Sequence, residues 1–175
     1  LVIPTGGSTP IGVWGYINCV EEIKKQLKPN KIGGILSAAG SGGTSAGLLL
    51  GSALHNFDIK VYAVNVIGSS DEMREIIVNL CEETLLKYKL PIKINYSNLI
   101  MLDGYSNEGY KNIAHDKVDL IKLFFHETGI LLDPAYTGKA FYAFNKLFLN
   151  KNSKVLFLHT GGMFGVFNKR KDFLK

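Results

Sequence analysis

The sequence has few cysteines and no long hydrophobic run. Two of its 175 residues are cysteine, too few for a scaffold built on disulfide bonds. The longest apolar stretches, such as residues 47–54, are far shorter than the roughly 18 residues that indicate a membrane span. The chain does not open on the basic segment and apolar run of a secretory signal. Its nineteen glycines show no three-residue repeat, which excludes a collagen-like chain.

What is present is the composition of an ordinary globular domain. Hydrophobic residues make up 46% of the chain and charged residues 20%, which excludes a disordered chain. The formal net charge is +5, but the basic residues are spread along the chain and are not interleaved with aromatic residues. We therefore expect a solvated basic surface, with no nucleic-acid and no membrane partner. Cys19 and Cys81 lie in segments of helical period and are expected to be reduced thiols in a cytoplasmic protein.

Short apolar runs alternate with longer segments of helical period. The apolar runs, which we expect to form strands, are residues 1–4, 34–38, 61–67, 99–102, 130–132 and 155–159. The segments expected to form helices are residues 11–27, 44–55, 70–86, 117–127 and 138–149. Ser70 fits the N-cap of the third helix. This alternation predicts an α/β fold of three layers, in which helices cover both faces of a mostly parallel twisted sheet.

Loops rich in glycine and hydroxyl residues follow four of the expected strands. These loops are residues 5–8, 39–44, 133–137 and 160–162. The carboxyl ends of parallel strands meet at one edge of a sheet, and α/β proteins bind their ligands at that edge. The sequence therefore predicts a binding site where these four loops come together.

The loop at residues 40–47 has the sequence Gly-Ser-Gly-Gly-Thr-Ser-Ala-Gly and joins a buried strand to the start of a helix. Free backbone N–H groups and the helix dipole bind an anion at such a place, and glycines let the backbone approach it. The loop is not a P-loop, because no Gly-Lys-Ser/Thr ends it. It is not the dinucleotide fingerprint either, which needs glycine where this chain has Ser45. We predict a single phosphate monoester as the ligand.

The same loop fits a second chemistry. Gly43, Ser45 and Gly47 match the Gly-x-Ser-x-Gly nucleophile elbow, and Asp133 and His159 follow in the order of a hydrolase triad. An elbow serine sits on a sharp turn directly after its strand, whereas Ser45 is expected inside the first helical turn. The serine hydrolase is therefore the weaker alternative. The histidines and cysteines show no metal-ligand spacing, so we expect no metal site.

Three segments taken together resemble one known family. They are residues 40–47, residues 127–139 (Glu-Thr-Gly-Ile-Leu-Leu-Asp-Pro-Ala-Tyr-Thr-Gly-Lys) and residues 159–162 (His-Thr-Gly-Gly). With the opening Ile-Pro-Thr-Gly-Gly-Ser of residues 3–8, they resemble the D-cysteine desulfhydrase and 1-aminocyclopropane-1-carboxylate (ACC) deaminase family over essentially the whole chain. The resemblance implies the tryptophan-synthase-β fold (fold type II) and pyridoxal 5'-phosphate as cofactor.

The resemblance also implies roles for individual residues. The expected cofactor-binding residues are Ser41, Gly42, Gly43, Thr44, Thr137, Thr160 and Gly161. Tyr105 and Tyr136 match two active-site tyrosines that lie over the substrate, a small amino acid, and are the expected catalytic residues. Tyr110 is close enough in the sequence to be the alternative to Tyr105. Without the resemblance, these tyrosines would be read as aromatic residues lining the edge of a core.

Thr137 and Thr160 distinguish two substrates. The resemblance implies glutamate and leucine here in the deaminase branch, and small hydroxyl residues in the desulfhydrase branch. A carboxylate would keep the pyridine nitrogen protonated, whereas threonine shares a hydrogen bond with a neutral nitrogen and leaves a weaker electron sink. Loss of a thiolate tolerates that weaker sink better than opening a cyclopropane. The expected function is therefore a D-cysteine desulfhydrase, a C–S lyase forming pyruvate, hydrogen sulfide and ammonia. The alternatives are ACC deaminase-like activity and a non-catalytic domain that binds a phosphate ligand.

The chain is expected to be the C-terminal, cofactor-binding portion of a longer enzyme. It opens on Leu1 within an apolar run, so an organellar targeting segment upstream remains an alternative to a cytoplasmic location. The family's Schiff-base lysine is expected upstream, in an Asn-Lys context. Lys139 matches a lysine that the family keeps in addition, and a structural role is expected for it. Residues 1–175 are expected to form one domain that is inactive alone, and the complete protein a homodimer.

Overall fold

Within the part of the chain that the structure describes, four parallel strands form the central sheet. The computed structural model describes residues 2–27, 32–110, 112–149 and 151–173. The strands are β1 (Gly34–Ala39), β2 (Lys60–Asn65), β3 (Leu99–Leu102) and β4 (Val155–Phe157), in the order β3-β2-β1-β4. β1 pairs with β2 along its whole length, from Gly34 opposite Lys60 to Ala39 opposite Asn65. All four carboxyl ends therefore meet at one edge of the sheet.

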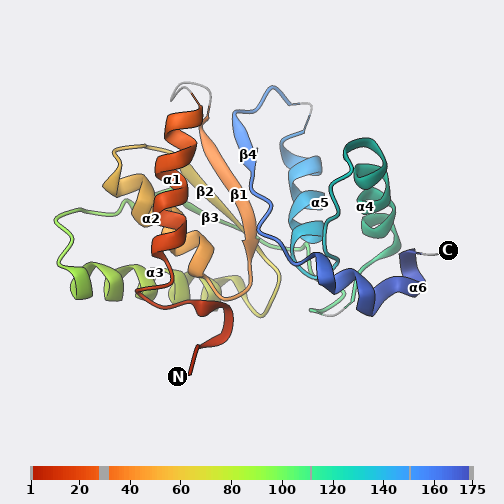
Figure 1. Cartoon of the computed structure of the whole chain (residues 1–175), viewed down its shortest axis with the longest axis horizontal. Coiled ribbons are helices and arrows are strands. Elements are labelled where there is room, and N and C mark those ends of the chain that lie inside the picture. Colours follow the sequence, from red (N-terminus) through yellow and green to blue (C-terminus); the bar gives the residue numbers. More distant parts are fainter. Residues whose placement is uncertain (1, 28–31, 111, 150, 174–175) are drawn as a thin grey trace.

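Helices cover both faces of this sheet (Figure 1). On one face lie α1 (Trp14–Gln26), α2 (Gly43–Leu54) and α3 (Ser70–Tyr88), which share a hydrophobic core with the strands. On the other face lies α5 (Thr137–Leu147), against which α4 (His115–Thr128) packs. The shorter helices are η1 (Thr5–Gly7), η3 (Tyr96–Asn98), η4 (Met163–Lys169) and α6 (Arg170–Phe173). The predicted three-layer α/β fold is confirmed.

Two glycines let α2 lie unusually close to α1. A Cβ atom added at Gly47 would lie 2.6 Å from Tyr16 Cβ and 2.7 Å from the Val13 carbonyl oxygen. One added at Gly51 would lie 2.9 Å from the Ile17 carbonyl oxygen. Any side chain at these positions would push the helices apart. The helix that follows the glycine-rich loop is therefore fixed from behind by α1.

Two of the expected strands are not strands. Residues 130–132 form an extended connection between α4 and α5, which lie on the same face of the sheet, so no strand is needed between them. Leu132 is nevertheless fully buried, which explains the apolar run. In the segment expected at residues 1–4, Val2 and Ile3 are exposed and unpaired with the sheet, and residue 1 lies outside the described residues.

Several element ends also differ from the prediction, for local reasons. β2 ends at Asn65 rather than residue 67, because the Asn65 side chain accepts from the Ile67 N–H at 3.4 Å and donates to the Gly68 carbonyl at 3.0 Å. The N-cap of α3 is Ser69, not Ser70: the Ser69 hydroxyl accepts from the Glu72 N–H in a capping box. Cys19 and Cys81 are free thiols, as expected. Across the described ranges, every helix is too short or too polar to cross a bilayer.

Candidate cofactor site

The glycine-rich loop lies where β1 ends and α2 begins. Gly42 is the N-cap of α2 with φ +82°, a conformation that glycine adopts without strain. The first hydrogen bond inside the helix runs from the Ala46 N–H to the Gly42 carbonyl at 2.9 Å. The N–H groups of residues 43–45 precede it and so have no partner within the helix. They surround a polar cavity of about 30 Å³, which is lined by residues 38–45 and suits a small anion.

Ser8 and Tyr136 pack against this loop and leave no room for side chains at two of its glycines. A Cβ atom at Gly43 would lie 2.6 Å from Ser8 Oγ, and one at Gly40 would lie 2.6 Å from Tyr136 Cε1. The Ser8 hydroxyl donates to the Ser41 hydroxyl at 2.8 Å. Because Ser41 accepts this bond, its own proton stays available to a ligand.

A larger cavity of about 200 Å³ opens beside the loop. It is lined by Thr5, Gly6, Ala38, Gly40, Ser41, Thr44, Ile67, Tyr136 and Thr160. Five of these side chains carry a hydroxyl group, and no carboxylate is among the described residues that line the cavity. The structure thus brings together four predicted site residues, Ser41, Thr44, Tyr136 and Thr160. Gly42 and Gly43 line the smaller cavity, and Gly161 adjoins Thr160 with its N–H donating to His159 Nδ1 at 3.2 Å.

The hydroxyl of Thr137 points to Asp133 rather than into the cavity. It donates to Asp133 Oδ1 at 2.8 Å and accepts from the Asp133 N–H at 2.9 Å. Asp133 Oδ1 also accepts from the Thr137 N–H at 2.7 Å, and Oδ2 accepts from the N–H groups of Ala135 and Tyr136, both at 2.8 Å. This fully buried carboxylate shapes the turn that presents Tyr136 to the cavity.

Tyr110, rather than Tyr105, lies against Tyr136. The two hydroxyls are hydrogen bonded, and the ring centroids are 5.5 Å apart. Burial and the hydrogen bond with Tyr110 raise the pKa of Tyr136 above its ordinary value, so its hydroxyl keeps its proton. Tyr105 instead meets Tyr142 edge to face at 6.4 Å. Neither Tyr105 nor Tyr110 lines the cavity itself, but Tyr110 contacts Tyr136, which does. The sequence offers two Gly-Tyr pairs five residues apart, and only the path of the loop distinguishes them.

The serine-hydrolase arrangement is not formed. Ser45 is fully buried within the first turn of α2, and its hydroxyl has no hydrogen-bond partner among the described residues. His159 Nδ1 accepts from the Gly161 N–H, and His159 Nε2 lies 3.2 Å from the Leu131 carbonyl oxygen. Asp133 and His159 thus serve local structure, and neither is hydrogen bonded to Ser45. Ser45 instead lines the small anion cavity, a role the sequence analysis did not assign to it.

Ser45→Ala is expected to stabilise the protein in phosphate-free buffer by about 1 kcal/mol, because it removes a buried hydroxyl without a partner. Ser52→Ala is the matched control in the same helix: the Ser52 hydroxyl donates to the Leu48 carbonyl at 2.7 Å, so its loss should bring no gain. Urea denaturation measures both variants. A lower stability for Ser45→Ala would contradict the expectation.

A nearly buried ion pair holds the loop that carries Tyr110. Lys117 Nζ, on α4, lies 2.7 and 2.9 Å from the two carboxylate oxygens of Glu108 and donates to the Tyr105 carbonyl at 2.5 Å. The side chains are 7% and 18% exposed. Burial alone would raise the pKa of Glu108, but the hydrogen bonds and charge of Lys117 outweigh it and lower that pKa.

Glu108→Gln is expected to cost about 2 kcal/mol of stability at pH 7. Because the pKa of Glu108 is lower in the folded than in the unfolded protein, its contribution is present above the ordinary value of about 4.3. It is lost as the pH falls through the folded pKa. The difference between wild type and variant in urea melts should therefore shrink below about pH 4. Glu21→Gln, which removes an exposed pair with Lys25, should change little at any pH; a constant gap for Glu108→Gln would contradict the linkage.

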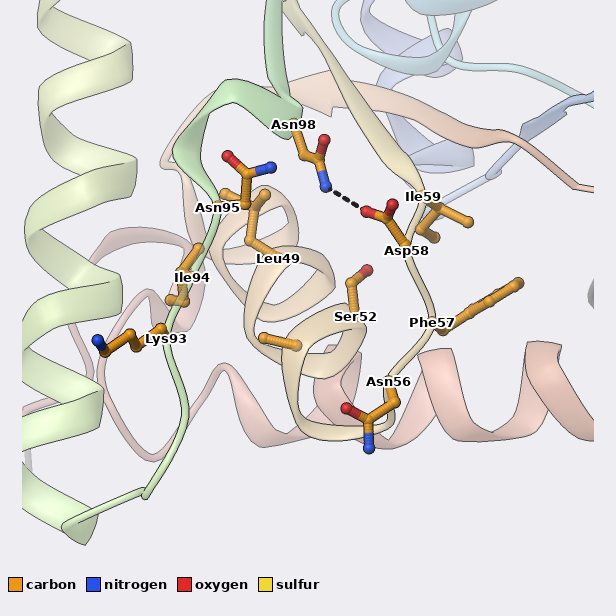
Figure 2. Close-up of a pocket in the computed structure, with 11 residues that line it drawn as sticks. Leu49, Ser52, Asn56, Phe57, Asp58, Ile59, Lys93, Ile94, Asn95 and Asn98 are labelled. Atoms are coloured by element: carbon orange, nitrogen blue, oxygen red, sulfur yellow. Dashed lines mark hydrogen bonds between the residues drawn. The ribbon is translucent and has the colours of Figure 1, made fainter.

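Another cavity, of about 330 Å³, lies at the opposite edge of the sheet, where β2 and β3 begin (Figure 2). Its walls come from the segments that precede β2 and β3, and Asn98 Nδ2 donates there to Asp58 Oδ1 at 2.8 Å. None of the predicted site residues lines it. The edge at the carboxyl ends of the strands is therefore the candidate site.

The donor set at that edge fits a phosphate ester. Free N–H groups at the start of α2, the unpartnered hydroxyl of Ser45 and the available proton of Ser41 can all donate to phosphate oxygens. The cavity next to it offers hydroxyl groups to an attached ring. The fold and this site define an α/β protein that binds a phosphorylated ligand at the carboxyl edge of its sheet.

The comparison with known proteins shows which family the chain belongs to. The sequence profile of the family "Pyridoxal-phosphate dependent enzyme" matches residues 1–161, and the chain belongs to this family. Its relatives include the bifunctional D-cysteine desulfhydrase/ACC deaminase of Arabidopsis thaliana, a mitochondrial protein, which is 34% identical over 96% of this chain and 43% of the relative. A putative ACC deaminase of Pyrococcus abyssi is 39% identical over 99% of this chain and 53% of the relative. The D-cysteine desulfhydrase of Yersinia pestis is 34% identical over 92% of this chain and 50% of the relative.

A solved structure confirms the expected enzyme fold. The crystal structure of an ACC deaminase homologue superposes with a TM-score of 0.86 at 37% identity, over 99% of this chain and 52% of that one. The chain spans about half the length of the curated relatives it matches. The family resemblance drawn from the sequence motifs is thus confirmed, and the cofactor in the family's name carries a phosphate ester of the kind that these residues fit.

Proposed function

We propose that this chain is the cofactor-binding part of a D-cysteine desulfhydrase, which cleaves D-cysteine to pyruvate, hydrogen sulfide and ammonia. The observation that carries the proposal is the lining of the 200 Å³ cavity, which offers hydroxyl groups and no carboxylate among the described residues. Thr160 is one of these hydroxyl residues. A neutral hydroxyl leaves the pyridine nitrogen unprotonated, which suits loss of a thiolate better than opening of a cyclopropane ring.

In this proposal, the residues of the glycine-rich loop hold the cofactor phosphate. Gly42, Gly43 and Thr44 would donate backbone N–H groups or hydroxyls, and Ser41 would donate the proton that Ser8 leaves available. When bound, pyridoxal phosphate supplies the electron sink for carbanion chemistry at the substrate Cα. Thr160 and Gly161 would line the cofactor from the opposite loop, and Thr137 would act through the Asp133 turn.

Tyr136 and Tyr110 are the residues proposed to contact the amino-acid substrate. Tyr136 lines the cavity, and its hydroxyl is hydrogen bonded to that of Tyr110. Tyrosine hydroxyls keep their protons at neutral pH, and burial raises the pKa of Tyr136 further. Such a pair can donate to the thiol or carboxylate of a small amino acid. In this proposal, Tyr110 takes the substrate-contacting role that the family resemblance implies for Tyr105.

The proposal is tested with the full-length enzyme. Formation of pyruvate from D-cysteine and of 2-oxobutanoate from ACC are measured side by side, and D-cysteine is expected to have the higher kcat/KM by at least about tenfold. Thr160→Leu should lower the D-cysteine activity, whereas Thr128→Ala, a change to an exposed hydroxyl on α4, should not. The isolated 175-residue chain should form no pyruvate. A preference for ACC would overturn the substrate assignment.

ACC deaminase activity is the second candidate. The Arabidopsis relative is named for both activities. A full-length enzyme that turned over both compounds with similar kcat/KM would favour such a bifunctional enzyme over the dedicated desulfhydrase.

A further inference from the structure

A buried lysine on α5 reaches the loop that carries Tyr110. Lys139 is fully buried, and its Nζ donates to the Gly109 carbonyl at 2.7 Å. It does not line the 200 Å³ cavity, so it does not touch a ligand held there. Its contact is instead with the backbone of the residue directly before Tyr110.

The burial of Lys139 is costly, and its hydrogen bond to the Gly109 carbonyl offsets part of that cost. Burial lowers the pKa of Lys139, while the carboxylates of Glu108 and Asp133 act in the opposite direction and the charges of Lys117 and Lys169 add to the lowering. An apolar side chain of similar length would fill the same space without the desolvation cost. What lysine adds is a donor aimed at the Gly109 carbonyl.

The Gly109 carbonyl lies directly before Tyr110 in the chain. It belongs to the peptide group that leads to Tyr110, and Gly109 itself has φ +88°, a conformation that favours glycine. Tyr110 is 40% exposed, so packing alone does not fix it. Tyr136 is the N-cap of α5 and Lys139 lies in its first turn. The start of α5 therefore contacts the loop twice: Lys139 binds the Gly109 carbonyl, and the Tyr136 hydroxyl is hydrogen bonded to Tyr110.

We propose that Lys139 is a positioning residue that holds the Gly109–Tyr110 peptide so that the Tyr110 hydroxyl meets the hydroxyl of Tyr136, the tyrosine that lines the substrate cavity. The proposal rests on the proposed function in that it takes this tyrosine pair to contact the amino-acid substrate. Lys117 serves a separate purpose in the same loop, because it binds the side chain of Glu108 and the carbonyl of Tyr105 further upstream.

The kinetic test is a double-mutant cycle in the full-length enzyme. Lys139→Met is expected to lower kcat/KM about 10- to 100-fold. In a Tyr110→Phe background, the same change should cost less than about twofold, because the two residues act through one hydroxyl. Lys146→Met is the matched control on α5: its Nζ lies over the Tyr142 ring at 4.3 Å, away from the cavity, and its loss should change kcat/KM by less than about twofold. Independent effects of Lys139→Met and Tyr110→Phe would overturn the proposal.

A second measurement requires no activity. In the cofactor-free full-length protein, Lys139→Met should speed hydrogen–deuterium exchange in the peptide covering residues 104–110 while leaving β1 and α2 unchanged. If Lys139→Met does not fold, Lys139→Gln, which keeps a shorter donor, should show the same local change. Unchanged exchange in this loop would overturn the proposal. If neither D-cysteine nor ACC is consumed, the proposed function fails, but the exchange experiment still decides the role of Lys139.

Discussion

Asp133→Ala is expected to lower the free energy of unfolding by about 3–5 kcal/mol. The fully buried carboxylate accepts hydrogen bonds from three successive backbone N–H groups, those of residues 135–137, and from the Thr137 hydroxyl. Alanine would leave these donors buried without partners. The change would also open the turn that presents Tyr136, so the effect extends from stability to the site.

Urea denaturation of the full-length enzyme measures this effect. Asp133→Asn, which keeps one carbonyl oxygen as an acceptor, should lose less stability than Asp133→Ala. Asp119→Ala, an exposed position on α4, is the control and should stay within about 0.5 kcal/mol of wild type. A loss below about 1 kcal/mol for Asp133→Ala would show that the turn is held by other contacts.

The double variant Ser41→Ala/Thr44→Val is expected to weaken binding of pyridoxal phosphate at least about 100-fold. Each hydroxyl would lose a hydrogen bond to a charged phosphate, and such bonds contribute roughly 1.5–3 kcal/mol each. Both residues line the 200 Å³ cavity and also the 30 Å³ anion cavity at the start of α2. Neither hydroxyl is needed for the central sheet, so the loss should appear in affinity rather than in folding.

Fluorescence titration of the full-length apoenzyme with pyridoxal phosphate measures the dissociation constant. Ser8→Ala should have a smaller effect, because Ser8 acts only by donating to Ser41 at 2.8 Å. Thr128→Val, on the exposed end of α4, should leave the affinity unchanged. If the double variant bound the cofactor as tightly as wild type, the phosphate would have to bind elsewhere.

The fold could be predicted from the sequence where local patterns decide it. The apolar runs that became β1 to β4 alternate with helical segments, and that alternation is enough to specify three layers. Residues 130–132 show the limit, because burial of Leu132 between two helices gives the same apolar run as a strand. Only the packing of α4 and α5 on one face of the sheet separates the two structures.

The candidate site, like the fold, could be predicted from the sequence only in part. The glycine-rich loop is a local strand-to-helix junction, so it could be recognised as an anion-binding site from its residue types alone. The tyrosine pair joins residues 26 positions apart, and the neighbouring contact of Lys139 with Gly109 joins residues 30 positions apart. The sequence alone therefore does not distinguish Tyr105 from Tyr110. The orientation of the Thr137 hydroxyl, set by Asp133, was equally beyond a reading of residue types.

The close approach of α1 and α2 limits how this enzyme can be redesigned. Gly47 and Gly51 bring α2 against the backbone of α1. The start of α2, which would hold the phosphate, therefore cannot move away from a larger ligand. A bulkier ligand cannot be accommodated by substitutions behind the loop. Variation in substrate range, whether by evolution or in the laboratory, must come from the front of the cavity, at positions such as Thr5, Ile67 and Thr160.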